Sequence, residues 1–297
     1  MHQAFTLVGG DGSIWGGGFR ANGSNREQEE LHKITMPEEC RNIKKVIQGK
    51  FNRVILTESN DLFFSGQPRK YMFGSGVGTT YDSLTKVRDN FYPMEEGDSI
   101  VDLTGGRHYT AIATKNGKVY ASGYMFYRVF SGCRRNNQND EDYPYELRMP
   151  DGWLAERVYG TERYSNLWVT CKNSEGTKRS FCAGQEEDVQ GHNSGSCTSS
   201  FVPIAVPDDV WFRQINSQRY CVFGIDQDQN IWQWGRHFGG SSETYQQMYG
   251  TSEIERRSKP YKLKWFEEKE LKCLEVQVGN QWAIVRTADK DGKQEFY

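Results

Sequence analysis

The sequence predicts an all-β chain: a single β-propeller over residues 1–297, with six or seven four-stranded blades and a ring closed by the N- and C-terminal strands. Three observations favour this fold. One repeat unit recurs along the chain, polar turn signals separate short apolar runs, and the composition combines 31 glycines and 13% aromatic residues with only 8 prolines. Glycine supplies positive φ in turns and aromatic residues are enriched in strands, so this composition suits short strands joined by tight turns.

The repeat unit consists of an apolar run, a glycine, a second apolar run, a polar turn and a short aromatic run closed by glycine. Its copies are expected to form the blade cores, at residues 5–18, 43–67, 100–124, 157–185, 211–237 and 274–297. The first copy matches only the second half of the unit, and the last stops within the closing strand. A period of about 50 residues with several strands per unit is typical of a propeller blade and not of a helical solenoid.

Turn signals divide each copy into strands. Asn-Gly or Asp-Gly between two apolar runs is the strongest short-range hairpin signal, and it occurs at residues 11–12, 116–117 and 291–292. The charged stretches 27–40 and 253–272 could hold short helices.

The stretches between the cores are expected to be inter-blade loops, at residues 68–99, 125–150, 186–210 and 238–272. The stretches 19–42, 68–99 and 237–272 also have room for inserted strands. Six copies therefore predict either six blades or a seventh blade without a recognisable core. Closure of the ring would remove sheet edges, which otherwise invite aggregation.

Charge and hydropathy narrow the class of protein. A net charge of −2 and a pI near 6.3 provide no basic field, so no nucleic-acid partner is expected. No apolar run is long enough to insert into a membrane, and the N-terminal residues lack the pattern of a secretory signal. We expect a soluble intracellular protein and favour the cytoplasm or cytoskeleton, with the nucleus and mitochondrion left open.

The cysteines indicate reduced thiols. There are 7, an odd number, and none of them forms a CxxC pair. Irregular spacing in a chain of this length favours small buried apolar side chains over a disulfide framework.

The best copy carries a specific resemblance. Residues 105–114 read GGRHYTAIAT and residues 116–123 read NGKVYASG, a pattern that resembles the repeat of the regulator of chromosome condensation (RCC1-like) family. The other copies are degenerate, because the family's histidine, which is His108 in the best copy, is replaced by Asn52, Arg163, Arg219 and Trp282. The resemblance implies a propeller with structural roles in the blades for Gly18, Gly66, Gly105, His108, Gly123, Gly184 and Gly235.

Motifs for catalysis or cofactor binding are weak. The glycine-rich residues 74–80 lack the Lys-Ser/Thr of a phosphate-binding loop, and Cys182, His192 and Cys197 match no standard zinc spacing. His108 has no serine or aspartate placed by the sequence to partner it as a general base, and the resemblance implies a structural role. We therefore predict no enzyme activity, no cofactor and no metal.

The charged, aromatic-bearing stretches 133–150 and 255–272 are candidate contact surfaces for other proteins. Loops on a rigid scaffold carry binding function, and Arg and Tyr are enriched at interfaces. The candidate partner-contact residues are Tyr127, Phe130, Arg134, Arg135, Tyr143, Tyr145, Tyr261 and Trp265.

The sequence is compatible with three functions. The favoured one is a non-catalytic protein-interaction scaffold, a structural subunit of a larger cytoskeletal, ciliary or other organellar assembly. The resemblance implies a second, a guanine-nucleotide exchange factor for a Ran-type small GTPase, but no wedge-like hairpin is recognisable. The third is a substrate-recruiting or regulatory domain of a ubiquitin-ligase system.

Overall fold

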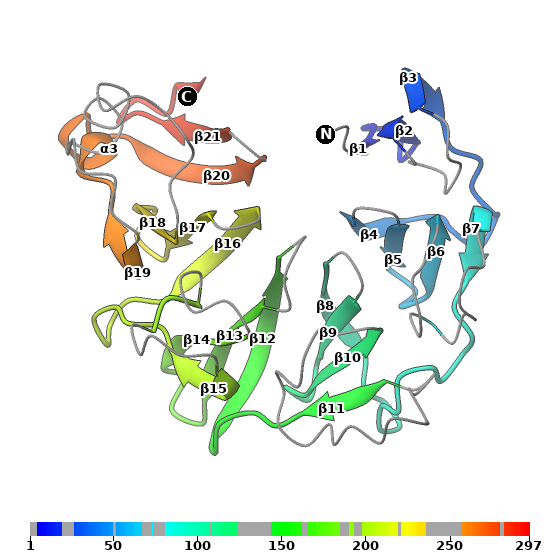
Figure 1. The fold of residues 1–297 in the computed structure, drawn as a ribbon, viewed down its shortest axis with the longest axis horizontal. Coiled ribbons are helices and arrows are strands. Elements are labelled where there is room, and N and C mark those ends of the chain that lie inside the picture. The colour runs from blue at the N-terminus through cyan, green and yellow to red at the C-terminus, as the bar shows by residue number, and fades with distance from the viewer. Residues whose placement is uncertain are drawn as a thin grey trace. The chain divides into compact units, whose positions relative to one another are not determined.

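The computed structural model contains six antiparallel sheets, each built from one continuous stretch of chain (Figure 1). We number these sheets blades 1 to 6 in chain order. The structure describes residues 5–19, 27–49, 52–66, 73, 81–106, 109–123, 144–161, 166–184, 190–192, 198–218, 221–235, 257–279 and 282–297. Within these residues the fold is all-β with six blades, and no seventh blade is present.

Blades 1 to 3 belong to one compact unit of the chain. Blade 1 consists of β1 (Phe5–Val8), β2 (Ile14–Phe19) and β3 (Glu27–Lys33). Blade 2 consists of β4 (Ile43–Gln48), β5 (Asn52–Thr57), β6 (Leu62–Gly66) and β7 (Tyr81–Lys86). Blade 3 consists of β8 (Ile100–Gly105), β9 (Tyr109–Thr114), β10 (Val119–Gly123) and β11 (Tyr145–Leu147).

Blades 4 to 6 belong to a second compact unit. Blade 4 consists of β12 (Trp153–Gly160), β13 (Asn166–Asn173), β14 (Lys178–Gly184) and β15 (Thr198–Pro203). Blade 5 consists of β16 (Phe212–Gln218), β17 (Cys221–Asp226), β18 (Ile231–Gly235) and β19 (Arg257–Lys262). Blade 6 consists of β20 (Lys272–Val278), β21 (Ala283–Ala288) and β22 (Gln294–Phe296), and the short helix α3 (Lys264–Glu268) precedes it.

The fourth strands come from the stretches between the predicted cores. Strands β3, β7 and β19 lie in the three stretches where inserted strands were predicted, which confirms that prediction. Strands β11 and β15 lie in residues 125–150 and 186–210, which were predicted only as loops. The connecting stretches therefore complete blades 2 to 5 rather than merely linking them.

The two end blades have three strands each among the described residues. Blade 1 has no strand before β1, as expected from a copy that matches only the second half of the unit. Blade 6 has no strand after β22. The first and last strands of the chain belong to different sheets, so ring closure through them stays a prediction.

The hairpin turns predicted between the second and third strands are confirmed. Gly12, Gly117 and Gly292 have φ angles of 79°, 81° and 79°. In the second of these turns the N–H of Gly117 donates to the carbonyl of Thr114 at 2.9 Å. Positive φ is the conformation that glycine adopts without a Cβ penalty, so these residues fix the turns and the strand register.

One helix prediction is confirmed and the other is wrong. The stretch 253–272 contains α3, whereas residues 27–33 of the stretch 27–40 form β3. Backbone pairing of β3 with β2 outweighs the helical preference of its charged residues, because tertiary context overrides a weak local propensity.

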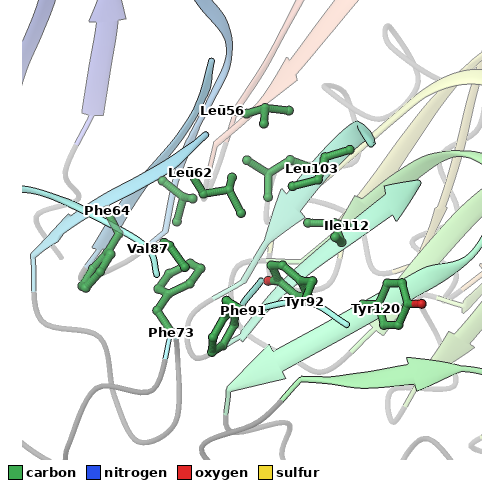
Figure 2. Close-up of a cluster of buried hydrophobic side chains, with 12 residues drawn as sticks. Leu56, Leu62, Phe64, Phe73, Val87, Phe91, Tyr92, Leu103, Ile112 and Tyr120 are labelled. Atoms are coloured by element: carbon green, nitrogen blue, oxygen red, sulfur yellow. The ribbon is translucent and has the colours of Figure 1, made fainter. Parts of the chain in front are cut away.

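Within each unit the core lies between successive sheets, and β5, β9 and β17, the second strands of blades 2, 3 and 5, are buried on both faces. All six residues of β5, β9 and β17 are buried. Between blades 2 and 3 the rings of Phe64, Phe73 and Phe91 pack in a row, with centroids 4.9 Å and 5.8 Å apart (Figure 2). Burial on both faces explains why these strands read as nearly continuous apolar runs.

Candidate interaction surfaces

The closing glycines lie where the third strand of a blade leaves its fourth strand. The pairing register shifts between Phe64 and Gly66, and the same shift occurs before Gly184 and Gly235. Gly66 and Gly235 have φ angles of 101° and 91°, which L side chains rarely adopt. A β-bulge of this kind needs glycine because the bulged backbone turns away from the ladder.

The other proposed blade glycines lie in similar surroundings. Gly18 ends a register shift in β2, and Gly123 ends β10 with a φ of 99°. A Cβ on Gly105 would lie 2.7 Å from Ile47 Cδ1, and one on Gly184 would lie 2.8 Å from the Asn166 Cα. His108 lies outside the described residues.

The two ends of every blade differ in their connections. At one end, which we call the turn-bearing end, the second and third strands join through tight turns, such as residues 58–61 and 227–230. At the other end, the loop-bearing end, the first strand joins the second and the third joins the fourth. Five of the candidate contact residues belong to the connection between β10 and β11 and lie outside the described residues. They are Tyr127, Phe130, Arg134, Arg135 and Tyr143.

Tyr145 and Tyr261 occupy equivalent positions in the fourth strands of blades 3 and 5. Tyr145 pairs with Ala121 and Tyr261 with Gln233, and both side chains are half-buried. The Tyr261 hydroxyl donates a hydrogen bond to the Oε1 of Gln233, which is fully buried. Tyr261 therefore satisfies a buried amide and leaves only part of its ring for a partner.

Trp265 lies at the turn-bearing end, in α3 between blades 5 and 6. Its ring packs edge-on against Phe266 and Tyr297, with centroids 4.9 Å and 5.3 Å away. Within their unit, Tyr261 therefore lies in the middle of a strand pairing and Trp265 lies at the turn-bearing end. The structure groups Trp265 with the C-terminal aromatic residues, which the sequence prediction missed although the chain ends in Glu-Phe-Tyr.

Among the residues that the structure describes, the exposed aromatic side chains lie on blade 6. The exposed fractions are 53% for Trp282, 71% for Phe296 and 45% for Tyr297. Trp282 lies one residue before β21, at the loop-bearing end, where the resemblance places the family's histidine. Aromatic residues that lie at the surface are typical anchors of protein interfaces.

A cavity of 560 Å³ lies at the turn-bearing end of blades 2 and 3. It is bounded by the turn that contains Asp61 and by residues 87–98. Lys86 bridges the Asp61 and Asp89 carboxylates at 2.8 Å and 3.2 Å, and its hydrogen bond lowers the pKa of Asp61 below the ordinary value. Two of the carboxylates that line this cavity, those of Asp61 and Asp89, are therefore paired with a lysine.

Arg53 is the largest charged side chain in the interior. It is 0% exposed, its Nε donates to Thr6 Oγ1 at 2.8 Å, and its Nη2 has no hydrogen-bond partner. Burial lowers the pKa of this guanidinium to about 10, and none of the described carboxylates forms an ion pair with it. A buried charge without an ion-pair partner lowers the free energy of unfolding, so Arg53 destabilises the interface between blades 1 and 2.

The described cysteines are buried thiols. Burial raises the pKa of Cys40 to about 11 and those of Cys221 and Cys273 to about 12, and it raises those of Cys171 and Cys182 as well. A neutral buried thiol is a poor nucleophile and a poor metal ligand. The described part of the chain holds no group of three His, Cys, Asp or Glu side chains that could bind a metal, and none of its helices could cross a membrane.

No family model matches this chain, and no curated protein sequence matches it. Solved structures do resemble it. Human WBSCR16 matches with a TM-score of 0.73 and 12% identity over 97% of this chain and 70% of its own. Prp20p from Saccharomyces cerevisiae, the yeast RCC1, matches with a TM-score of 0.68 and 15% identity over 99% of this chain and 69% of its own.

The likeness extends beyond these two propellers. The β-propeller domain of the Trilobed protease from Pyrococcus furiosus matches with a TM-score of 0.50 and 7% identity, over 99% of this chain and 76% of its own. At such identities a structural likeness establishes the fold and nothing further. The chain has the fold of the RCC1-like β-propellers.

Proposed function

We propose that this chain is a non-catalytic protein-interaction scaffold and a structural subunit of a larger assembly. The observation that carries this proposal is the set of exposed aromatic residues on blade 6, a blade of the unit whose strand β17 is fully buried. Rigid elements that present large rings form interfaces at low entropic cost. The described cysteines are buried and are therefore not candidates for a catalytic nucleophile.

The comparisons support a protein partner in general terms. The yeast propeller Prp20p has been described with its binding to Gsp1p and histones, and bound to Kap60. These partners belong to that protein, and at 15% identity they do not transfer to this chain. For this chain we propose a protein partner in the cytoplasm or cytoskeleton.

The likeness to Prp20p also favours one alternative function, guanine-nucleotide exchange on a Ran-type small GTPase. It would require a GTPase-binding surface on one end of the blades. The loop-bearing end is the natural location, since loops on a rigid scaffold carry most binding function.

We also propose that the blades close into a ring at the chain termini. What supports closure is the difference between inner and end blades. Every residue of the inner strand β17 is buried, whereas the equivalent strands of the end blades leave Leu7 51% and Ile284 46% exposed. Large apolar side chains on a sheet face usually have another sheet against them.

Affinity purification of the tagged full chain from its own cells in mild salt tests the scaffold proposal. We expect stoichiometric partners that stay bound with or without GTP. Trp282→Ala should weaken their recovery, because it removes an exposed anchor. Leu154→Ala is the matched control, since Leu154 is exposed to the same extent, 52% against 53%.

The nucleotide arms separate the two functions. Recovery of a small GTPase that is held without nucleotide and released by GTP would replace the scaffold proposal with exchange activity. A free chain with no stoichiometric partner would contradict both.

A further inference from the structure

The cavity of 560 Å³ at the turn-bearing end of blades 2 and 3 has an apolar floor and an acidic rim. The floor is defined as the buried apolar residues that line the cavity and belong to the hydrophobic cluster of Figure 2, which are Leu62, Val87, Phe91, Tyr92 and Ile100. The rim is defined as the carboxylates that line it, which are Asp61, Asp89, Glu95, Glu96 and Asp98. Ligand-binding pockets span about 300–1,000 Å³, so this cavity has room for a whole side chain of a partner.

Two of the rim carboxylates have no cation of this chain beside them. Lys86 and Lys118 pair with the other three and leave Glu96 and Asp98, neither of which forms an ion pair with a described residue. Arg88 is the one basic residue among those that line the cavity, and its Cζ lies 5.5 Å from the centroid of the Phe91 ring. The rim therefore carries an excess of negative charge above an apolar floor.

Asp98 is fixed in place through one of its two carboxylate oxygens. Its Oδ1 accepts hydrogen bonds from the N–H of Ser99 at 2.9 Å and from that of Asn116, in the turn between β9 and β10, at 3.0 Å. Its Oδ2 is buried and has no hydrogen-bond partner among the described residues. A buried acceptor without a donor costs stability, so a donor supplied by a partner would be stabilising at this position.

An arginine side chain matches this combination of groups. Its guanidinium carries five N–H donors in a planar fork, can pair with two carboxylates, and is more weakly hydrated than an ammonium group. Its methylene stem can lie along apolar surface while the charged head stays at the opening. The contact between Arg88 and Phe91 shows that a ring of the floor accepts a guanidinium over its face.

We propose that this cavity binds an arginine side chain from a basic segment of a partner protein, with the guanidinium hydrogen-bonded to Asp98 Oδ2 and paired with Glu96. The site lies on blades 2 and 3, so it goes beyond the proposed scaffold surface. It depends neither on the aromatic residues of blade 6 nor on exchange activity.

The experiment titrates the isotope-labelled full chain with the peptide GSLRLSG and follows the backbone amides by NMR. We expect saturable shifts at residues 94–100 and at Asn116, whose N–H donates to Asp98. A matched peptide carries citrulline in place of the arginine, which keeps the shape of the side chain and removes its charge. This peptide should bind roughly tenfold more weakly or worse, because a hydrogen bond to a charged group is lost.

Three variants of the full chain locate the bound arginine. Asp98→Asn keeps an oxygen for the two N–H donors but replaces Oδ2 with an amide nitrogen, so the affinity should fall about tenfold or more. Glu96→Gln removes an exposed carboxylate and should lower it about two- to fivefold. Glu58→Gln is the matched control, since Glu58 is exposed in the neighbouring turn and does not line the cavity.

Equal binding of the two peptides would overturn the inference, and so would saturable shifts confined to another part of the chain. Agmatine that binds as tightly as the peptide would assign the cavity to a small amine and overturn the assignment to a protein segment. The peptide comparison uses the unmodified chain and remains decisive if Asp98→Asn fails to fold. A chain that binds the arginine peptide but recovers no native partner would contradict the scaffold function and leave this site standing.

Discussion

Gly123 shows how a single backbone angle limits the sequence of a blade. It ends β10 opposite Tyr109 with a φ of 99°, where a side chain would strain the chain. The closing glycine could be predicted from the repeat alone because its signal is local. The φ angle and the bulge beside it could not, since both depend on where the fourth strand departs.

We predict that Gly123→Val lowers the free energy of unfolding by on the order of 1–3 kcal/mol, because valine is forced into a rarely populated region. Chemical denaturation measures the change. Gly10→Ala is the control, since a Cβ there meets nothing within 4 Å. Equal stability of the parent and the valine variant would show that this glycine is not required.

Arg53 could not be predicted as an interior residue, since arginine is seldom fully buried. In the structure its side chain runs between blades 1 and 2, and its Nη2 lacks a partner. The pKa near 10 that burial imposes is below the ordinary value of 12.5. The unfolded state therefore holds this proton more tightly than the folded state does, and Arg53 weakens the fold at all pH values below about 10.

Arg53→Met is expected to leave the free energy of unfolding unchanged or to raise it by up to about 4 kcal/mol, because a methionine fills similar volume without a charge. Arg53→Ala should lower it, because the space is left empty. Thermal and chemical unfolding at pH 7 distinguish them. A methionine variant that melts well below the parent would mean that the guanidinium has an anionic partner in solution.

At the scale of elements, the hairpins of each blade could be predicted and the fourth strands could not. The second and third strands of a blade are recognisable in the sequence from the turn between them, such as Asn116-Gly117. A strand as short as β11 has three residues and no periodicity of its own, and it is defined by pairing with β10. The same limit explains β3, whose charged residues favoured a helix until its pairing with β2 was known.

Leu263→Ala should destabilise the unit of blades 4 to 6 by about 2–5 kcal/mol, because Leu263 is buried in a packed hydrophobic cluster. Leu154→Ala, at an exposed position of β12, should change stability by less than about 0.5 kcal/mol. Denaturant titrations of both variants give the comparison. Equal effects would show that the burial of Leu263 does not stabilise its unit.

At the scale of the whole molecule, the number of repeat copies predicted the number of blades, and the candidate contact surface was only partly predictable. The packed aromatic residues next to blade 6 come from α3 and from Tyr297 after β22, which are separate in sequence and meet only in the fold. Single tyrosines in charged stretches could be identified from the sequence, but Tyr261 is held by Gln233 and its exposed part is small.

Removal of residues 1–18 should lower the melting temperature of the chain. Ile14 is fully buried against Ile55 and Phe63, and Thr6 accepts the hydrogen bond of Arg53. If the ring closes through its termini, hydrogen exchange should also accelerate in blade 6. Unchanged unfolding of the truncated chain would mean that blade 1 is not integral, and acceleration limited to blade 2 would contradict closure.

The central claim is that this propeller works as a subunit of an assembly, and the native size of the protein tests it most directly. The chain alone has a mass of 34.2 kDa. Size-exclusion chromatography of a gentle native extract, followed by immunodetection, should place nearly all of the protein at several times that mass, together with partners in fixed ratio. Elution of the protein as a single chain at physiological salt would contradict the account.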